Sequence, residues 1–233
     1  PDGININQNC GSTNPQFLKE EMMKGSYDIG IAFDGDGDRI LIVTSDGEIL
    51  DGDDILYILS SNLSVDSGIV GTLMTNKALE LHFQKNNIPF MRADVGDKYV
   101  LHRLIEESWL LGGEPSGHII CLDSAPTGDA IIAALKILFA LKDSNFSLKK
   151  SLEEFKKFPQ TLINLKVDNP NRIIISDKFW SKVTQIEKLL GEKGRVLIRP
   201  SGTEPLIRIM VESDDPSTSE DLCNALADLA QTI

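Results

Sequence analysis

The segment DIGIAFDGDGDR at residues 28–39 carries three aspartates at alternate positions in a glycine-spaced loop. Asp34, Asp36 and Asp38 lie close enough along the chain for their charges to repel one another strongly. A hard divalent cation such as Mg²⁺, which prefers oxygen ligands, would neutralise that repulsion, and Arg39 adds a positive charge beside it. The loop therefore predicts a magnesium site, with a solvated turn as the alternative because short motifs also arise by chance.

Two other interpretations of this segment, as a calcium loop or as a phosphatase site, can be tested on the sequence. An EF-hand loop beginning at Asp34 needs glycine at its sixth position and glutamate at its twelfth, and this chain has Arg39 and Ser45 there. The calcium loop is therefore excluded. A phosphatase of the haloacid-dehalogenase type also carries an Asp-x-Asp pair after a strand, so Asp34 as a nucleophile stays open.

A second segment, RPSGTEPLIRIMVES, combines hydroxyl groups, a glycine and two arginines. Ser201, Gly202 and Thr203 form a polar turn after Arg199, and hydroxyls, free N–H groups and a guanidinium suit a phosphate dianion. Arg208 alternates with apolar neighbours in the next strand and should face away from them. The segment predicts a phosphate site, against an ordinary β-turn.

A third segment, LGGEPSGHII, places Glu114, Ser116 and His118 at alternate positions between two apolar stretches. A carboxylate, a hydroxyl and an imidazole suit sugar hydroxyls, which both donate and accept hydrogen bonds. Ser116 is not a nucleophile elbow, because that motif requires glycine two residues before and two residues after the serine. Taken alone, the pattern is weak, and a glycine-rich hairpin explains it better.

The elements that must position these loops follow from hydrophobic periodicity. Alternating strands and helices indicate a mainly parallel or mixed sheet covered by helices in three layers, with ligands at the strand ends, and the tail predicts a small α+β domain. We expect parts at 1–50, 51–146 and 147–233, with a linker at 143–145. The expected strands are 28–34, 39–44, 48–50, 68–74, 88–93, 109–112, 118–122, 161–168, 194–199 and 205–212, and the expected helices are 53–62, 76–86, 97–107, 128–142, 147–155, 176–190 and 217–231.

The composition and net charge of the chain limit the partners and the cellular location that we expect for it. The 233 residues are 41% hydrophobic and 25% charged, which allows a sizeable core in more than one domain. A net charge of −12 disfavours nucleic acid and anionic membranes as partners. No apolar run reaches a membrane span, and three dispersed cysteines suggest reduced thiols, so we expect a cytoplasmic protein. Trp109 and Trp180 are expected in the core.

In this order, the loops DGDGDR, GEPSGH and RPSGTEPLIR resemble those of the α-D-phosphohexomutases. Further segments support the resemblance along nearly the whole chain. They are Ile4 to Asn7, Cys10 to Thr13, Gly71 to Met74, Val95 to Val100 and Thr127 to Asp129. Within the family, the chain is most similar to the members that act on glucosamine phosphates. It departs from them at Pro115, where they usually carry glutamine.

The resemblance implies interconversion of glucosamine 6-phosphate and glucosamine 1-phosphate through a phosphoserine and a bisphosphate. Mg²⁺ would bind the three aspartates, and Arg39 would neutralise the transferring group. Glu114 and Ser116 would bind sugar hydroxyls, with His118 either joining them or serving structure. Asp97 or Lys98 would assist proton transfer. The phosphate that is not transferred would be held by Arg199, Ser201, Gly202, Thr203 and Arg208.

The family's phosphoserine loop resembles Thr-Ala-Ser-His-Asn-Pro, and no Ser-His-Asn occurs in this chain. The resemblance therefore implies the C-terminal half of a four-domain enzyme, inactive alone and completed by N-terminal domains of the same polypeptide. In the family the last domain is mobile, which implies a hinge near 145–158. The alternatives are a mannose or glucose phosphate mutase, a magnesium phosphatase and a non-catalytic phosphosugar-binding module.

Overall fold

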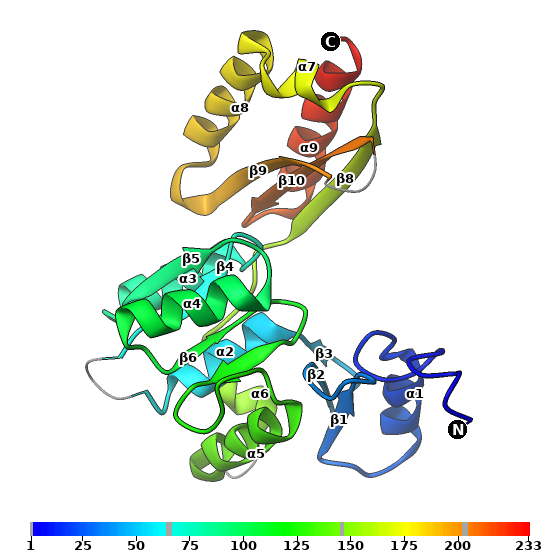
Figure 1. The fold of residues 1–233 in the computed structure, drawn as a ribbon, viewed down its shortest axis with the longest axis vertical. Coiled ribbons are helices and arrows are strands. Elements are labelled where there is room, and N and C mark those ends of the chain that lie inside the picture. Colours follow the sequence, from blue (N-terminus) through cyan, green and yellow to red (C-terminus); the bar gives the residue numbers. More distant parts are fainter. Residues whose placement is uncertain (1, 64–66, 145–146, 202–204) are drawn as a thin grey trace. The chain divides into compact units, whose positions relative to one another are not determined.

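The computed structural model describes residues 2–63, 67–144, 147–201 and 205–233. It forms two compact units, Pro1–Lys156 and Lys157–Ile233, each with its own secondary structure (Figure 1). The first unit contains α1 (Gln16–Lys24), β1 (Ile29–Phe33), β2 (Ile40–Thr44), β3 (Ile49–Leu50), α2 (Gly52–Ser60), β4 (Ile69–Thr72), α3 (Lys77–Lys85), β5 (Phe90–Ala93), α4 (Asp97–Glu107), β6 (Leu111–Gly113), β7 (Ile119–Cys121), α5 (Ala130–Ala140), η1 (Leu141–Ser144) and α6 (Leu148–Ser151).

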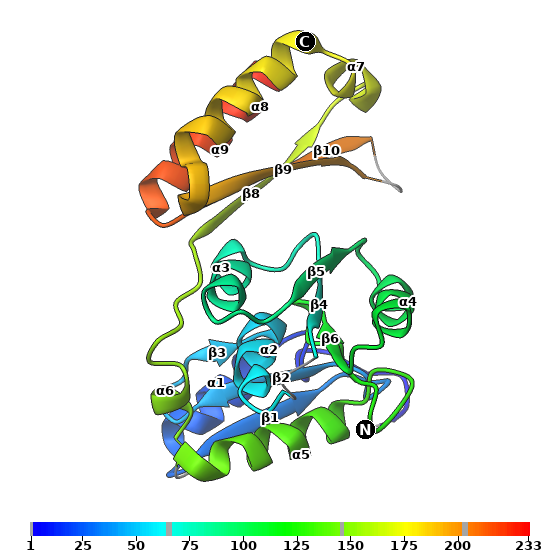
Figure 2. The ribbon, with the colours of Figure 1, turned by 90° about the vertical axis from the view of Figure 1, so that its left-hand side faces the viewer.

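A four-stranded mixed sheet in the order β5-β4-β6-β7 organises the functional loops of this unit. Strand β4 pairs in parallel with β5 and β6, whereas β6 and β7 are antiparallel. Helix α4 packs against β4, β5 and β6, and Figure 2 shows it beside these strands. Because parallel strands end at the same edge, the loops after Thr72, Ala93 and Gly113 emerge together.

A second, antiparallel sheet in the order β1-β2-β3 carries the aspartate loop, residues 34–39, between β1 and β2. Asp46 and Gly47 form the turn between β2 and β3: Gly47 has a φ of +81°, and its N–H donates to the Thr44 carbonyl at 3.0 Å. The helix that follows begins at a capping box. The Asp51 side chain accepts from the N–H of Asp53, and the Asp54 side chain accepts from the N–H of Asp51.

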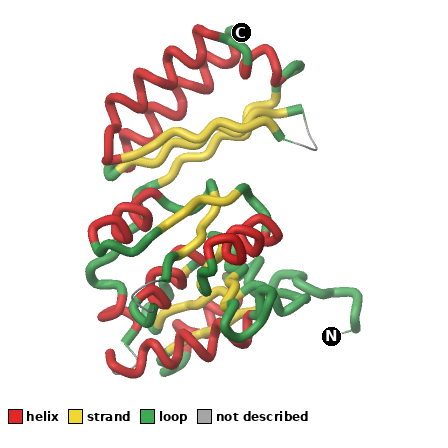
Figure 3. Tube along the Cα trace, turned by 60° about the vertical axis from the view of Figure 1, so that its left-hand side comes forward, coloured by secondary structure: helices red, strands yellow, loops and turns green. Residues whose placement is uncertain are grey.

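The second unit is a sheet covered by helices on one face, as Figure 3 shows. Its strands are antiparallel in the order β8-β10-β9, and the apolar residues of β10 pack against α8 and α9 around the fully buried Phe179 and Leu226. Its elements are β8 (Gln160–Lys166), α7 (Pro170–Ile174), α8 (Asp177–Leu190), η2 (Gly191–Lys193), β9 (Gly194–Pro200), β10 (Leu206–Ser213) and α9 (Pro216–Gln231).

Most expected elements are present with ends shifted by one or two residues. The helix expected from Ser147 to Phe155 was too long, since α6 ends at Ser151, and the expected linker overlaps the 3₁₀ turn η1. Helices α1 and α7 were missed. Only one residue of each is buried, so neither shows an apolar stripe that periodicity could detect.

The core assignment of Trp180 was wrong. Its side chain is 39% exposed, and the indole N–H donates to the carbonyl of Ile174 at 2.6 Å. Trp109 packs against the apolar cluster around Val100 and Leu104, as expected. A tryptophan near the surface can pack its ring and still hydrogen-bond its indole N–H, as Trp180 does with Ile174.

Candidate functional site

A cavity of about 520 Å³ lies where the loops of the first unit meet. Its lining comes from the aspartate loop, from the ends of β4 and β5, and from the Glu-Pro-Ser loop, residues 114–118. The lining residues are Asp38, Arg39, Thr72, Met74, Val95, Gly96, Asp97, Glu114, Pro115, Ser116 and His118. The structure thus brings together residues from two of the three sequence motifs, although these motifs lie about 80 positions apart.

Backbone contacts join the aspartate loop to the Glu-Pro-Ser loop. The N–H of Ile40 donates to the carbonyl of Gly117 at 3.0 Å, and Arg39 and His118 form an isolated antiparallel bridge. Gly117 has a φ of +91°, and a Cβ there would lie 2.1 Å from the Ile40 carbonyl oxygen. Only glycine therefore allows the two loops to approach this closely.

His118 forms part of the wall of the cavity. Its side chain is 6% exposed, and Nδ1 lies 3.1 Å from Oδ2 of Asp38. Its ring packs against Gly128, where a Cβ would lie 2.3 Å from Nε2, and Nε2 has no hydrogen-bond partner among the described residues. An imidazole that orients a carboxylate in this way is a common support for a metal ligand.

The aspartates of this loop differ in their contacts and in their exposure to solvent. Oδ1 of Asp34 accepts from the backbone N–H of Arg39 at 3.1 Å, and Nε of Arg39 lies 3.9 Å from Oδ2. Burial raises the pKa of Asp34, but the hydrogen bond from the Arg39 N–H and the nearby Arg39 charge act against burial, and the pKa is lowered overall. Asp36 is exposed to solvent.

These acids fit a hard cation by donor chemistry, since Asp34, Asp36 and Asp38 supply carboxylate oxygens from one short loop. In the part of the chain that the structure describes, however, no three acid, histidine or cysteine side chains converge as a metal-holding group. The magnesium site that the sequence predicts at the three aspartates stays a prediction.

The Glu-Pro-Ser loop is also tied to its neighbours. Oε1 of Glu114 accepts from the N–H of Gly96 at 2.9 Å, and the Pro115 carbonyl accepts from the N–H of Gly52 at 3.1 Å. Of the two residues expected to assist proton transfer, Asp97 lines the cavity at the start of α4. The ammonium of Lys98 lies instead 4.7 Å from the centre of the Tyr99 ring.

Sequence reasoning named Thr72, Met74 and Val95 only as parts of matching segments, without assigning them to the site. They enter the cavity because they lie at the carboxyl ends of β4 and β5. Strand ends of a parallel sheet are the usual place for ligands, so this rule, applied to every predicted strand, would have found them.

In the second unit, two arginines oppose each other across neighbouring strands. Arg208 of β10 is paired with Arg199 of β9, and Nε of Arg208 is buried without a hydrogen-bond partner among the described residues. Burial and the Arg208 charge both lower the pKa of Arg199. Like charges directly opposite each other destabilise a sheet, so the pair favours a bound anion.

The rest of the predicted phosphate loop is described only in part. Ser201 follows β9, and its N–H donates to the carbonyl of Leu206 at 2.9 Å. Gly202 and Thr203 lie outside the described residues. Arg208 faces away from the buried Ile207 and Ile209, as the alternation predicted.

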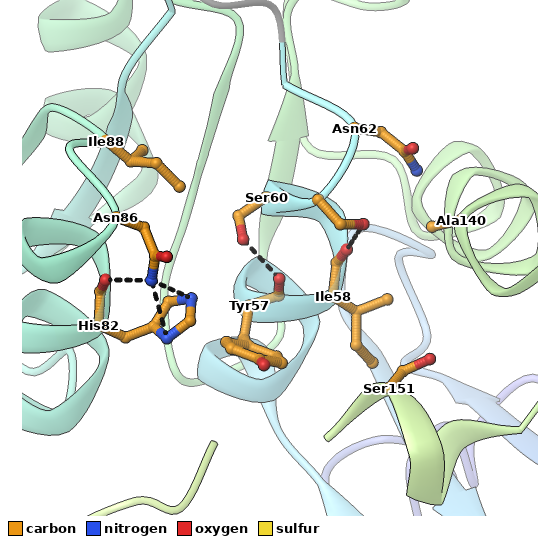
Figure 4. A pocket seen from close by; sticks show the side chains of 10 residues that line it. Tyr57, Ile58, Ser60, Asn62, His82, Asn86, Ile88, Ala140 and Ser151 are labelled. Carbon is orange, nitrogen blue, oxygen red and sulfur yellow. Dashed lines mark hydrogen bonds between the residues drawn. The ribbon is translucent and has the colours of Figure 1, made fainter. Parts of the chain in front are cut away.

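A second cavity of about 420 Å³ lies beside α2 and α3 (Figure 4). Asn86 donates to the backbone carbonyl of His82 at 2.8 Å, and Ser60 donates to that of Tyr57 at 2.6 Å. Burial lowers the pKa of His82, and its ring packs against Tyr57 and Phe155. These internal contacts indicate a structural role.

No helix among residues 2–63, 67–144, 147–201 and 205–233 has the length and apolar character needed to span a bilayer.

Comparison with known families and curated proteins gives consistent matches. The model described as phosphoglucomutase/phosphomannomutase, alpha/beta/alpha domain III matches residues 51–158, and the model of the C-terminal domain matches residues 162–229. A phosphoglucosamine mutase from Acinetobacter baylyi is 48% identical over 233 residues, which are 100% of this chain and 53% of the relative. One from Pseudomonas entomophila is 46% identical over 241 residues, with coverage of 100% and 53%. The chain thus spans about half the length of the curated relatives it matches.

Solved structures show the same fold. An N-acetylphosphoglucosamine mutase from Aspergillus fumigatus, in complex with GlcNAc-6P and magnesium, matches with a TM-score of 0.76 and 21% identity over 95% of this chain and 56% of its own. A phosphoglucomutase/phosphomannomutase family protein from Burkholderia thailandensis matches with a TM-score of 0.75 and 23% identity, over 94% and 50%. These likenesses confirm the expected α/β fold followed by a small α+β unit.

Proposed function

Because the chain belongs to the phosphoglucomutase/phosphomannomutase family, as its three loops led us to expect, we propose that it forms part of a phosphoglucosamine mutase. The proposed enzyme is an isomerase of the cytoplasm that interconverts glucosamine 6-phosphate and glucosamine 1-phosphate. The observation that carries the proposal is the 48% identity to a phosphoglucosamine mutase along the whole chain, with two motif loops meeting in one cavity. Since the chain spans half of that relative, turnover is proposed for a longer polypeptide that supplies the remaining domains and the phosphoserine.

Phosphoryl transfer consists mostly of positioning and charge neutralisation, and the cavity offers groups for both. Mg²⁺, when bound, supplies positive charge next to the transferring group. Asp34, Asp36 and Asp38 would hold it, and His118 orients Asp38 through the 3.1 Å contact. Arg39 would add a second positive charge at the rim of the cavity.

We assign the binding of the sugar and of its phosphate to other residues. We assign the sugar hydroxyls to Glu114 and Ser116, which both line the cavity. We assign the phosphate that is not transferred to Arg199 and Arg208, which face each other across β9 and β10, with Nε of Arg208 buried and without a hydrogen-bond partner among the described residues. Gly202 and Thr203 complete that proposed loop from outside the described residues. Proton transfer stays with Asp97 or Lys98, of which Asp97 lines the cavity.

The division into parts is likewise a proposal. We keep 1–50 as the end of a preceding domain with the aspartate loop, 51–146 as the domain with the Glu-Pro-Ser loop and 147–233 as the phosphate-binding domain. The matched family domain begins at 51, which supports the first boundary, and the compact unit Lys157–Ile233 supports a separate last part, although that unit begins ten residues after 147.

The test joins this chain to the complementary half of the Acinetobacter baylyi relative and assays mutase turnover with Mg²⁺ and a hexose bisphosphate. We expect turnover from the joined protein and none from the 233-residue chain alone. Release of inorganic phosphate by the chain alone, abolished in Asp34→Asn, would instead establish the phosphatase. Phosphosugar binding without turnover by the joined protein would establish the non-catalytic module. Faster turnover of mannose or glucose phosphates would reassign the substrate.

A further inference from the structure

The cavity of the first unit is acidic, and its carboxylates differ in how they are held. Asp38, Asp97 and Glu114 line it, against the single guanidinium of Arg39. Asp38 is paired with His118, and Glu114 accepts a backbone N–H. Asp97 is exposed, and its carboxylate has no hydrogen-bond or ion-pair partner among the residues that the structure describes.

Glu114 and Asp97 are brought near each other by a backbone contact. Oε1 of Glu114 accepts at 2.9 Å from the N–H of Gly96, the residue directly before Asp97. The first residue of the Glu-Pro-Ser loop therefore lies beside the start of α4, and Glu114 and Asp97 both line one cavity. Neighbouring carboxylates raise the cost of keeping both ionised unless a cation lies close to them.

The proposed Mg²⁺ belongs to the aspartate loop, residues 34–39, so the positive charge beside Asp97 and Glu114 has to come from a different group. An ammonium group needs only a few acceptors, because its three hydrogens are each satisfied by one oxygen. An amino sugar carries such a group on its ring.

We propose that Asp97 is a specificity-determining residue that binds the ring ammonium of an amino-sugar phosphate, with Glu114 beside it binding hydroxyls. This inference rests on the proposed function and deepens it, because it says how the cavity distinguishes an amino sugar from the neutral sugar with a hydroxyl in the same place. Recognition by charge also suits a loop in which Pro115 offers no side-chain hydrogen bond.

The experiment measures binding of three phosphosugars to the 233-residue chain by NMR titration. The ligands are glucosamine 6-phosphate, glucose 6-phosphate and N-acetylglucosamine 6-phosphate, of which only the first carries the ammonium. The variant is Asp97→Asn, which keeps the size of the side chain and removes its charge. We expect binding of glucosamine 6-phosphate to weaken at least tenfold, equivalent to about 1.4 kcal/mol. Binding of the other two should change less than about threefold.

The chain offers a matched control. Asp177 is also the first residue of a helix, is also exposed, and is also followed by a lysine and an aromatic residue. Asp177→Asn therefore makes the same change at a helix N-terminus of the second unit, where a negative charge stabilises the helix to a similar extent. We expect this variant to bind all three sugars as the unchanged chain does.

The outcomes separate the inference from the proposed function. Equal binding of glucosamine and glucose 6-phosphates by the unchanged chain, or equal losses for all three sugars in Asp97→Asn, would overturn the ammonium role alone. If none of the sugars shifts cavity signals, both the inference and the assignment of this cavity to a phosphosugar fail. Matching effects of Asp97→Asn and Asp177→Asn would show a helix effect and also overturn the inference.

Discussion

Replacing Arg208 with glutamine should stabilise the second unit while removing its response to phosphate. Arg208 and Arg199 are directly opposed in the sheet, and Nε of Arg208 is buried without a partner among the described residues. Opposed like charges cost a sheet about 0.2–1 kcal/mol, so we expect the free energy of unfolding to rise by about that amount. We expect two opposed arginines to lower the stability of the sheet until an anion binds to them.

Arg208 should account for most of the stabilisation that bound phosphate gives to the second unit. At a phosphate concentration ten times the dissociation constant, mass action stabilises the unchanged protein by about 1.4 kcal/mol. For a unit the size of Lys157–Ile233 this corresponds to a rise in Tm of roughly 5–10 °C. Each charge-assisted hydrogen bond contributes about 1.5–3 kcal/mol, so loss of one guanidinium should nearly abolish the shift.

Differential scanning calorimetry with and without phosphate, at matched ionic strength, measures both effects. Arg172→Gln is the control, because Arg172 is an exposed arginine on α7 of the same unit. We expect it to change neither the stability without phosphate by more than about 0.5 kcal/mol nor the phosphate response. The reasoning is refuted if Arg208→Gln keeps the full phosphate shift, or if both variants behave alike.

Three further predictions concern stability and reactivity. Arg195→Met should destabilise the second unit by about 3–5 kcal/mol in urea unfolding, because it removes the guanidinium that lies 2.7 Å from the fully buried carboxylate of Glu212. Burial raises the pKa of Glu80, but the hydrogen bond and charge of Arg92 outweigh burial, so the pKa of Glu80 is lowered in the folded protein. The stabilisation that follows is present above the pKa of the unfolded state and is lost as the pH falls through the pKa of the folded state. Glu80→Gln should therefore flatten the acid side of the Tm–pH curve. Burial raises the pKa of Cys121 to about 11, so its alkylation by iodoacetamide at pH 8, followed by mass spectrometry, should be at least tenfold slower than that of free cysteine.

Local sequence was enough for most of the fold and for the chemistry of the loops. Periodicity predicted the strands and helices because one face of each is buried, and the alternation around Arg208 followed from the two-residue period of a strand. Hydrophobic periodicity did not predict helix α1, because Met22 is its only buried residue. Trp180 was misplaced because residue type alone does not say whether the indole N–H finds a partner near the surface.

The arrangement of the site depended on contacts between distant residues. His118 meets Asp38 across 80 positions of chain, and the N–H of Gly96 meets Glu114 across 18. Neither contact has a local signal, because each follows from the parallel pairing of β4 with its neighbours and from the close approach that Gly117 permits. The sequence by itself determined which groups are available for chemistry, since residue type decides charge and donors. Only the tertiary structure decided that Asp97 faces a cavity and that Arg199 opposes Arg208, because strand register and loop packing bring such side chains together.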